Sequence, residues 1–381
     1  MGPGNLEIVE IHSKEDRHAM ATFPWVVYRG DKNWVPPLVK DRDKQLDSQR
    51  NRFFQQADVV LFAARRDGRV AGTTAAFIDH RFNDCLKQKV GFFGFFEVLD
   101  DYQAAEALFS AARDWARQRG MTELRGPINF HRDRERGFLV EGADCPPPLM
   151  CAHSPPYYHE FAQRFGLTKH ADDFCRRVWV KNVLGPDGGL PPRLARLQKV
   201  AERRAHFSIR KARLEDWDNE VRRVGELYDA TIGQMPDHIP WTQEELAEFA
   251  RELRPVVVPD FALFGEVNGK TVGCALGFPD LNQVLIHLNG SLDGLNKLKA
   301  WWYLRRINIV SFKVAGVLEQ YQGLGLEALL FLELAKGALA RGYQTVDLSL
   351  QAEENDKVNN LMQHFQVENY KRYRVYRMPL Q

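Results

Sequence analysis

The sequence has few cysteines and no cysteine pair of the kind that binds a metal. Its five cysteines are scattered, odd in number and without a Cys-x-x-Cys pair: Cys85, Cys145, Cys151, Cys175 and Cys274. This pattern argues against a disulfide framework and against a zinc site. We therefore expect a reducing compartment and no metal.

Long apolar runs and a strong charge of one sign are also missing. No window is long and uncharged enough to span a bilayer, and the N-terminus has no basic region followed by an apolar stretch. These absences predict a cytoplasmic protein that is neither exported nor integral to a membrane. The formal net charge of +2 over 381 residues excludes a generally basic nucleic-acid binder. The length predicts two or three domains.

The most informative stretch is a glycine turn, Gln322-Gly-Leu-Gly-Leu-Glu327, between an apolar run (307–317) and a helical run (328–339). A helix N-terminus leaves backbone N–H groups unpaired and carries a partial positive charge, and glycines let a phosphate come close to them. The candidate ligand is therefore a phosphorylated cofactor. The alternative is an ordinary connection between a strand and a helix.

Two common nucleotide motifs do not fit this turn. A P-loop ends in Gly-Lys-Ser/Thr, and the dinucleotide fingerprint needs a third glycine and a later acidic residue. The turn instead resembles the acyl-CoA loop of the GNAT N-acetyltransferase superfamily, written Gln/Arg-x-x-Gly-x-Gly/Ala. Gln322 and Gly325 fit this pattern, whereas Glu327 departs from it.

The resemblance extends over roughly residues 206 to 381. The segment 261–277 is similar to the central hairpin of that superfamily, with a turn at Asn268-Gly269, and Asn355 resembles the asparagine that follows its next strand. The resemblance implies transfer of an acyl group from acetyl-CoA or a longer acyl-CoA to an amine. It implies pantetheine pairing along 313–317 and pyrophosphate binding by the amides of 322–328. The cofactor residues so implied are Val314, Gly316, Val317, Gln322, Gly323, Leu324, Gly325, Leu326, Glu327, Ala328 and Asn355.

The first half of the chain repeats the same order of signals. The segment 60–77 matches the later hairpin, and Gly68 and Gly72 have the separation of Gly269 and Gly273. We therefore expect an α/β (α+β) fold with two tandem GNAT-like domains, each a mixed, mostly antiparallel sheet flanked by helices. The expected boundaries are a degenerate N-terminal domain at 1–184, a linker with a basic helix at 185–205, and an acyl-CoA-binding domain at 206–381.

The first copy has Asp100-Asp101 where the second has its glycine turn. Two carboxylates at a helix start satisfy the helix dipole and would repel a pyrophosphate, so we expect this copy to have lost the cofactor. Its irregular stretch at 129–158 carries polar groups suited to an amine or a headgroup. In the alternative, the tyrosines only anchor the next helix. The candidate substrate residues here are Asn129, His131, Glu141, Tyr157 and Tyr158.

About twenty extra residues precede the cofactor strand in the second copy, at 281–305, and they include Trp301 and Trp302. Burial of apolar area stabilises by about 25 cal/mol per Å², so these side chains are expected to cover an interface between the units or an apolar ligand. The ligand alternative predicts a long acyl chain or a sphingoid-type lipid amine rather than a small amine. The basic segment 193–213 suits an acyl carrier protein or an anionic membrane surface, or it is a solvated face.

Acyl transfer to an amine needs a polarised thioester, a neutral amine and a proton donor for the thiolate. Many members of the superfamily carry an acidic tyrosine where this chain has Met362, which cannot donate a proton. His364 and Tyr370 are the nearby substitutes, and Glu319 is the candidate base. Because Glu327 and Met362 depart from the pattern, a catalytically silent binding or regulatory protein is the alternative function.

Overall fold

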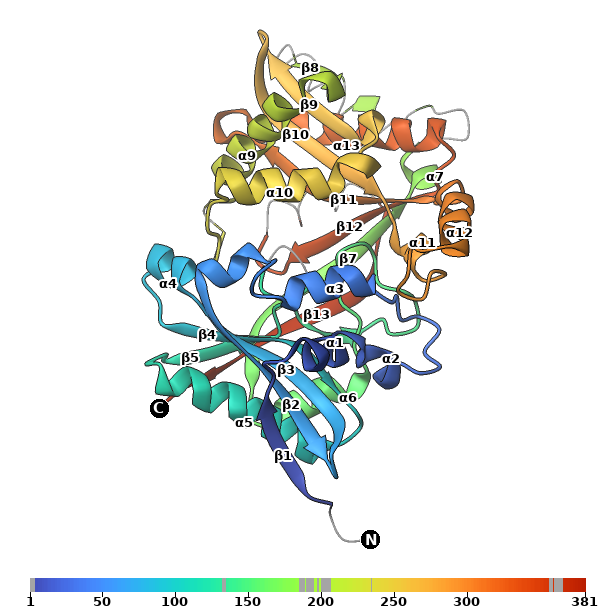
Figure 1. Cartoon of the computed structure of the whole chain (residues 1–381). Helices are drawn as coiled ribbons and strands as arrows, with labels where there is room; N and C mark the ends of the chain where they lie inside the picture. The colour runs from blue at the N-terminus through green and yellow to red at the C-terminus, as the bar shows by residue number, and fades with distance from the viewer. Residues whose placement is uncertain are drawn as a thin grey trace. The chain divides into compact units, whose positions relative to one another are not determined.

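The computed structural model describes residues 4–131, 135–184, 189, 195–196, 199, 207–233, 235–355, 359 and 366–381. These residues form two compact units, each discontinuous in sequence (Figure 1). The first comprises Met1–Phe174, Asn282–Arg305 and Lys371–Gln381, and the second comprises Cys175–Leu281 and Arg306–Tyr370. The sequence predicted two domains that follow one another along the chain. Composition gives no sign of a strand whose first residues belong to one unit and whose last residues belong to the other.

The first unit is a mixed sheet with the strand order β1-β2-β3-β4-β5-β13. Its neighbours are antiparallel except for β4 and β5, which are parallel, and β6 pairs with β13. The strands are β1 (Leu6–Glu10), β2 (Ala57–Arg66), β3 (Arg69–Asp79), β4 (Val90–Val98), β5 (Glu123–Gly126), β6 (Phe138–Glu141) and β13 (Val367–Pro379). The helices are α1 (Lys14–Thr22), α2 (Pro24–Val27), α3 (Val39–Leu46), η1 (Arg52–Gln55), α4 (His80–Leu86), α5 (Tyr102–Gln118), α6 (Pro156–Arg164), α11 (Asn282–Leu285) and α12 (Leu295–Leu304).

Helix α5 builds the core of the first unit. Asp101 caps it, because its carboxylate accepts the Ala104 N–H at 3.2 Å. Its apolar face, which includes Leu108 and Phe109, packs against sheet residues such as Phe93 and Phe96. The predicted irregular stretch differs from expectation, since it contains β6 and the start of α6.

The second unit has the strand order β7-β12-β11-β10-β9-β8. Here β8, β9, β10 and β11 are antiparallel, whereas β11 and β12 are parallel. The strands are β7 (Thr168–Trp179), β8 (Phe207–Lys211), β9 (Ala262–Val267), β10 (Lys270–Pro279), β11 (Ile309–Val317) and β12 (Thr345–Ala352). The helices are α7 (Val180–Val183), η2 (Leu214–Asp216), α9 (Trp217–Ile232), α10 (Gln243–Leu253), η3 (Arg254–Val256), η4 (Pro259–Phe261), η5 (Glu319–Tyr321) and α13 (Leu326–Ala340).

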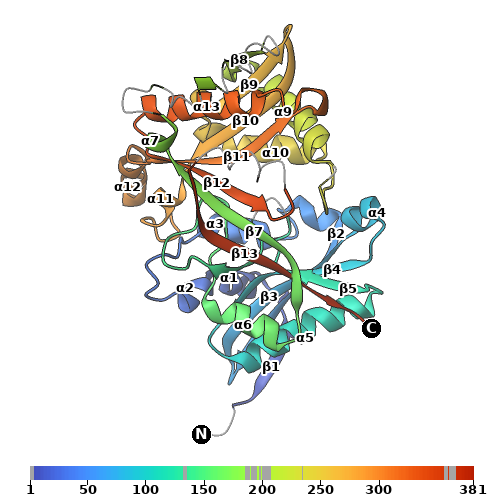
Figure 2. The same ribbon diagram turned by 180° about the vertical axis from the view of Figure 1, so that it is seen from behind.

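Helices cover both faces of this second sheet (Figure 2). Helix α13 packs on one face through Leu330 and Leu334, against residues such as Val272. Leu227 of α9 packs with Phe264 and Cys274, whose side chains point to the other face because strand side chains alternate. Strand β11 is therefore held between two helical layers.

The predicted repeat is confirmed by strand register. Gly72 of β3 pairs with Val98 of β4, and Gly273 of β10 pairs with Val317 of β11. In both units the strand that follows the hairpin then joins a parallel neighbour over three residue pairs. Within the described ranges, no helix has the length and apolar character needed to cross a membrane.

Candidate functional site

The site is built where two parallel strands of the second unit part. Strands β11 and β12 pair at Ile309, Val310 and Ser311, and the last of these lies opposite Asp347. Both strands continue further, β11 to Val317 and β12 to Ala352, and the structure describes them in full. Beyond Ser311 the backbone pairing of β11 with β12 is not continued, whereas its pairing with β10 continues to Val317. The edge of a strand can pair with an extended ligand.

A buried carboxylate, Asp347, lies at the point of divergence. Its side chain accepts hydrogen bonds from the hydroxyls of Ser311 at 3.1 Å, Ser349 at 2.7 Å and Tyr370 at 2.5 Å. Asp347 and Ser311 are at most 1% exposed, whereas Tyr370 is half-buried. Hydrogen bonds to a buried carboxylate offset the cost of removing it from water. Three hydroxyls therefore converge on one buried carboxyl group.

A lysine of β11 contacts β12 two residues beyond this acid. A bulge in the pairing of β10 with β11 leaves Lys313 without an opposite residue. Its ammonium group donates to the Ser349 carbonyl oxygen at 3.2 Å. An acid, three hydroxyls and an ammonium group from β11, β12 and β13 therefore lie close together at this point.

The glycine turn follows β11 after the short helix η5. Gly323 and Gly325 have φ angles of 70° and 101°, and Gly325 is the N-cap residue of α13, which has no side-chain cap. Gln322 Nε2 donates to the Val317 carbonyl oxygen at 2.8 Å, which fixes the turn to the end of the strand. Leu324 and Ala328 are half-buried, and Leu326 is buried. The positive end of a fifteen-residue helix therefore faces the turn.

Glu327 lies on the turn rather than away from it. Its carboxylate accepts the Gly323 N–H at 3.3 Å. This side chain therefore uses one N–H group of the turn, and an acidic residue at this position typically stabilises a helix start by roughly 0.3–1 kcal/mol.

The remaining candidates of the second unit are separate from Asp347, apart from Tyr370. Glu319 is exposed and begins η5, while Asn355 follows β12 and its N–H donates to the Ala352 carbonyl oxygen. Met362 and His364 lie outside the described residues, as does most of the predicted basic helix. Of the predicted catalytic residues, the structure brings Tyr370 to the divergence. Asp347 was missed, although an aspartate and a serine two residues apart in a buried strand were a usable signal.

The corresponding place in the first unit is filled by its own side chains. Strands β4 and β5 also part after three pairs, at Phe92 and Arg125. The Val98 N–H donates to Tyr158 Oη at 2.7 Å, and the Tyr157 hydroxyl donates to the Val98 carbonyl oxygen at 2.9 Å. Val98 has the register of Val317, whose carbonyl oxygen accepts instead from the side-chain amide of Gln322. Both predicted substrate residues have a structural role here.

A half-buried acid, Glu97, contacts one of these tyrosines. The Tyr158 hydroxyl donates to Glu97 at 2.9 Å. Burial raises the pKa of the Glu97 carboxyl to about 7, and the hydrogen bonds from Tyr158 and Tyr28 oppose that rise only in part. Glu97 is thus largely protonated below neutrality.

The raised pKa predicts a pH-dependent stability. The folded protein keeps a proton on Glu97 up to about pH 7, whereas the unfolded chain releases this proton above about pH 4.5. The contribution of Glu97 to the free energy of unfolding is therefore fully present below about pH 4.5 and is lost as the pH rises through 7. In the parent protein the free energy of unfolding is expected to fall by about 3 kcal/mol between about pH 5 and about pH 8 because of Glu97. Glu97→Gln should not show this fall. Urea unfolding of both proteins across this range measures it. Equal pH slopes for the two would contradict the assignment.

The other first-unit candidates do not meet in one place. Asn129 Oδ1 accepts the Phe95 N–H at 2.6 Å and its Nδ2 donates to Glu135 at 2.7 Å, while the His131 N–H donates to the Asn129 carbonyl oxygen. Glu141 is exposed and pairs with Arg372. Trp301 and Trp302 are also exposed, so the expectation that they cover an interface or an apolar ligand stays a prediction. Among the residues that the structure describes, no cluster of His, Cys, Asp or Glu could hold a metal ion.

Comparisons with known proteins cover almost the whole chain. No protein-family model matches it. Protein YghO of Escherichia coli K12 is 28% identical over 96% of this chain and 93% of its own length. The bacterial ceramide synthase of Caulobacter vibrioides is 27% identical over 99% of this chain and 98% of its own.

Solved structures with this fold include a tandem GNAT protein from the clavulanic acid biosynthesis pathway, with a TM-score of 0.58 and 14% identity over 99% of both chains. A GCN5-related N-acetyltransferase from Sphaerobacter thermophilus gives a TM-score of 0.52 and 12% identity over 99% of this chain and 96% of its own. These similarities confirm the predicted fold of two tandem GNAT-like units.

Proposed function

We propose that this chain, which has the tandem GNAT fold, is an acyl-CoA-dependent N-acyltransferase whose second unit carries the reaction. The observation that carries the proposal is that the pairing of β11 with β12 ends at Ser311 and that β11 then leads, through η5, to a glycine turn and the start of α13. Strand β11 offers an edge that an extended ligand can pair with, and the start of α13 offers a positive helix end for a pyrophosphate. An acyl-CoA has both an extended arm and a pyrophosphate. The first unit, plugged by Tyr157 and Tyr158, is left with a structural role.

The acyl-CoA would be held mostly by backbone. Residues 314–317 would pair with the pantetheine, and the amides of 322–328 would face the pyrophosphate. A thioester placed between β11 and β12 would lie beside Asp347 and the Lys313 ammonium group, which can polarise its carbonyl oxygen.

Tyr370 and Asp347 are proposed to carry the proton of the reaction. The amine nitrogen forms a bond to the thioester carbon, the C–S bond breaks, and one amine proton must reach the sulfur. Tyr370 donates its own proton to Asp347, so its oxygen can accept the amine proton and later return a proton to the thiolate. Ser311 and Ser349 position the carboxylate through their hydroxyls.

A lipid amine is the acceptor class that the comparisons favour. The Caulobacter relative, named a bacterial ceramide synthase, aligns over 99% of this chain. By that relationship, the acyl donor would be a long-chain acyl-CoA and the acceptor a sphingoid-type amine. Acetyl-CoA with a small amine is the other candidate pair, supported by the acetyltransferase structures of the same fold.

Calorimetric titration of the full chain with acetyl-CoA and with palmitoyl-CoA tests the proposal. We expect saturable binding, and incubation with a panel of amines should give one N-acylated product by mass spectrometry. A preference for acetyl-CoA would exclude the lipid acceptor class. Failure of both acyl-CoA donors to bind would exclude the acyltransferase function and favour a catalytically silent binding protein. The contact of Glu327 with the turn would then explain why no acyl-CoA binds.

A further inference from the structure

Large exposed apolar side chains gather in one short segment of the first unit, around α12. Within the described ranges, seven large hydrophobic residues are strongly exposed, and all but Val26 belong to 292–304. Leu295 is 77% exposed and Leu298 is 66% exposed. The others in this segment are Leu292, Trp301, Trp302 and Leu304. Such a concentration marks a surface that is covered by something in the cell.

The same segment is basic. Residues 295–305 include three cations and no acidic residue. The cations are Lys297, Lys299 and Arg305, all of them exposed. The Arg305 guanidinium lies 3.6 Å from the ring centroid of Trp301, so a cation and an aromatic ring share the surface. The acidic residue just before the helix, Asp293, is paired with Lys40 at 3.0 Å.

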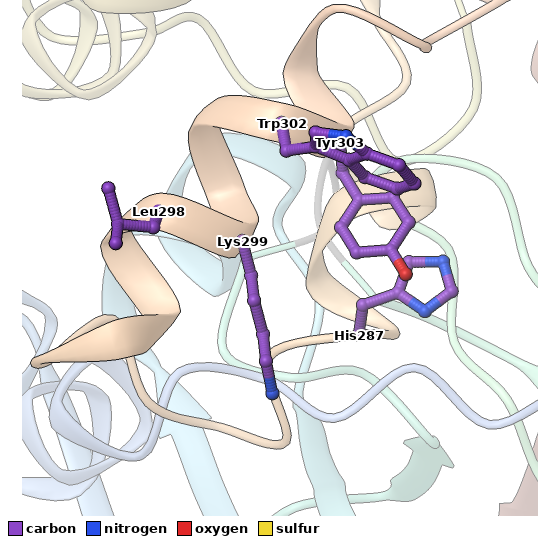
Figure 3. Close-up of a pocket in the computed structure, with 5 residues that line it drawn as sticks. All are labelled: His287, Leu298, Lys299, Trp302 and Tyr303. Atoms are coloured by element: carbon purple, nitrogen blue, oxygen red, sulfur yellow. The ribbon is translucent and has the colours of Figure 1, made fainter.

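An open cavity of about 350 Å³ lies beside α12 (Figure 3). It is lined by His287, Leu298, Lys299, Trp302 and Tyr303. The rings of His287 and Tyr303 stack with centroids 3.8 Å apart, and the Lys299 side chain extends away from them (Figure 3). The cavity therefore combines aromatic walls with one ammonium group.

The base of the segment is fixed to the rest of the first unit. Asn282 Nδ2 donates to the carbonyl oxygens of Pro147 and Pro148 at 2.9 and 3.0 Å. The Trp25 indole N–H donates to Asn289 at 2.8 Å, and the Val39 N–H donates to the Gly290 carbonyl oxygen at 2.9 Å. A surface held in this way is presented as a rigid face rather than as a loose loop.

We propose that this face, residues 292–305, docks onto an anionic lipid bilayer. Leucine and tryptophan side chains enter the boundary between headgroups and acyl chains, where aromatic rings are favoured. The lysines and Arg305 then meet the lipid phosphates, with Lys299 beside a cavity of headgroup size. A soluble acidic protein would satisfy the cations but would leave the exposed leucines and tryptophans in water. The proposal does not depend on the proposed acyltransferase activity.

Sedimentation of the full chain with vesicles tests the docking face. We expect binding to vesicles of phosphatidylcholine mixed with phosphatidylglycerol, and little binding to phosphatidylcholine alone. Lys297→Gln/Lys299→Gln is expected to weaken binding to the mixed vesicles by roughly fivefold for each charge removed. Leu298→Ser/Trp301→Ser should weaken it at least tenfold, on the order of the loss of several buried methylene groups.

The matched control removes two exposed cations from hairpin turns. Arg69→Gln/Lys270→Gln changes the net charge as much as the α12 charge variant does, and it is expected to bind like the parent protein. Equal losses in the two charge variants would assign binding to net charge and overturn the proposal, as would the absence of binding to any vesicle. Sedimentation velocity could also show a dimer that Leu298→Ser/Trp301→Ser dissociates. That result would assign the face to a second copy of the chain and would overturn the proposal.

Discussion

Replacing Gly325 by valine is expected to abolish acyl-CoA binding by the second unit. Gly325 has φ 101° and ψ 0°, a conformation that a β-branched residue adopts only with strain. Relief of the strain would rotate the peptide units that begin α13, and the N–H groups of the turn would no longer converge on one anion. We expect CoA to bind at least about 100-fold more weakly, which corresponds to roughly 3 kcal/mol. Calorimetric titration with CoA measures this loss.

Two controls separate loss of the site from loss of the fold. Gly269→Val introduces the same residue type at φ 76° in a hairpin turn of the same unit, where an added Cβ meets no atom within 4 Å. Asp100→Asn alters the exposed acid of the first unit. Both variants should bind CoA normally, whereas Glu327→Gln should bind it more tightly because the repulsive charge is gone. Weaker binding in Asp100→Asn would show that the cofactor belongs to the first unit.

Local signals in the sequence were sufficient for the repeat and for the turn. Gly68 and Gly269 occupy hairpin turns with φ 76°, and glycine is the residue that such turns require. The apolar run before the turn became β11, and the helical run after it became α13. These features depend on neighbours in the chain, so a pattern of a few residues carries them.

Features that depend on distant residues were missed. Strands β7 and β13 each contribute residues to both units, and no local pattern announces such a division. The Asp347 cluster joins residues from β11, β12 and β13, which the sequence separates by up to 59 positions. The departure of Glu327 from the family pattern was visible in the sequence. Its contact with Gly323 required the coordinates.

Tyr370→Phe is expected to give the second large effect, on the chemical step. The substitution keeps the ring and removes only the hydroxyl that donates to Asp347 at 2.5 Å. If Tyr370 carries the proton from the amine to the thiolate, kcat should fall on the order of 10²- to 10⁴-fold, the usual contribution of general acid–base catalysis. The dissociation constant for CoA should stay unchanged, because backbone groups hold the cofactor. Steady-state kinetics and calorimetry with the same preparation separate these two quantities.

The matched control for this change is Tyr343→Phe, in the same unit. The Tyr343 ring packs edge-on against Phe261 with centroids 5.1 Å apart, and its kcat should be that of the parent protein. Asp347→Asn should reproduce the loss of Tyr370→Phe, and the double variant should lose little more, since residues that act as one unit are not additive. A kcat for Tyr370→Phe within about threefold of the parent protein would remove Tyr370 from the proton path. Additive losses in the double variant would instead mean that Asp347 and Tyr370 act in separate steps, because a shared proton can be interrupted only once.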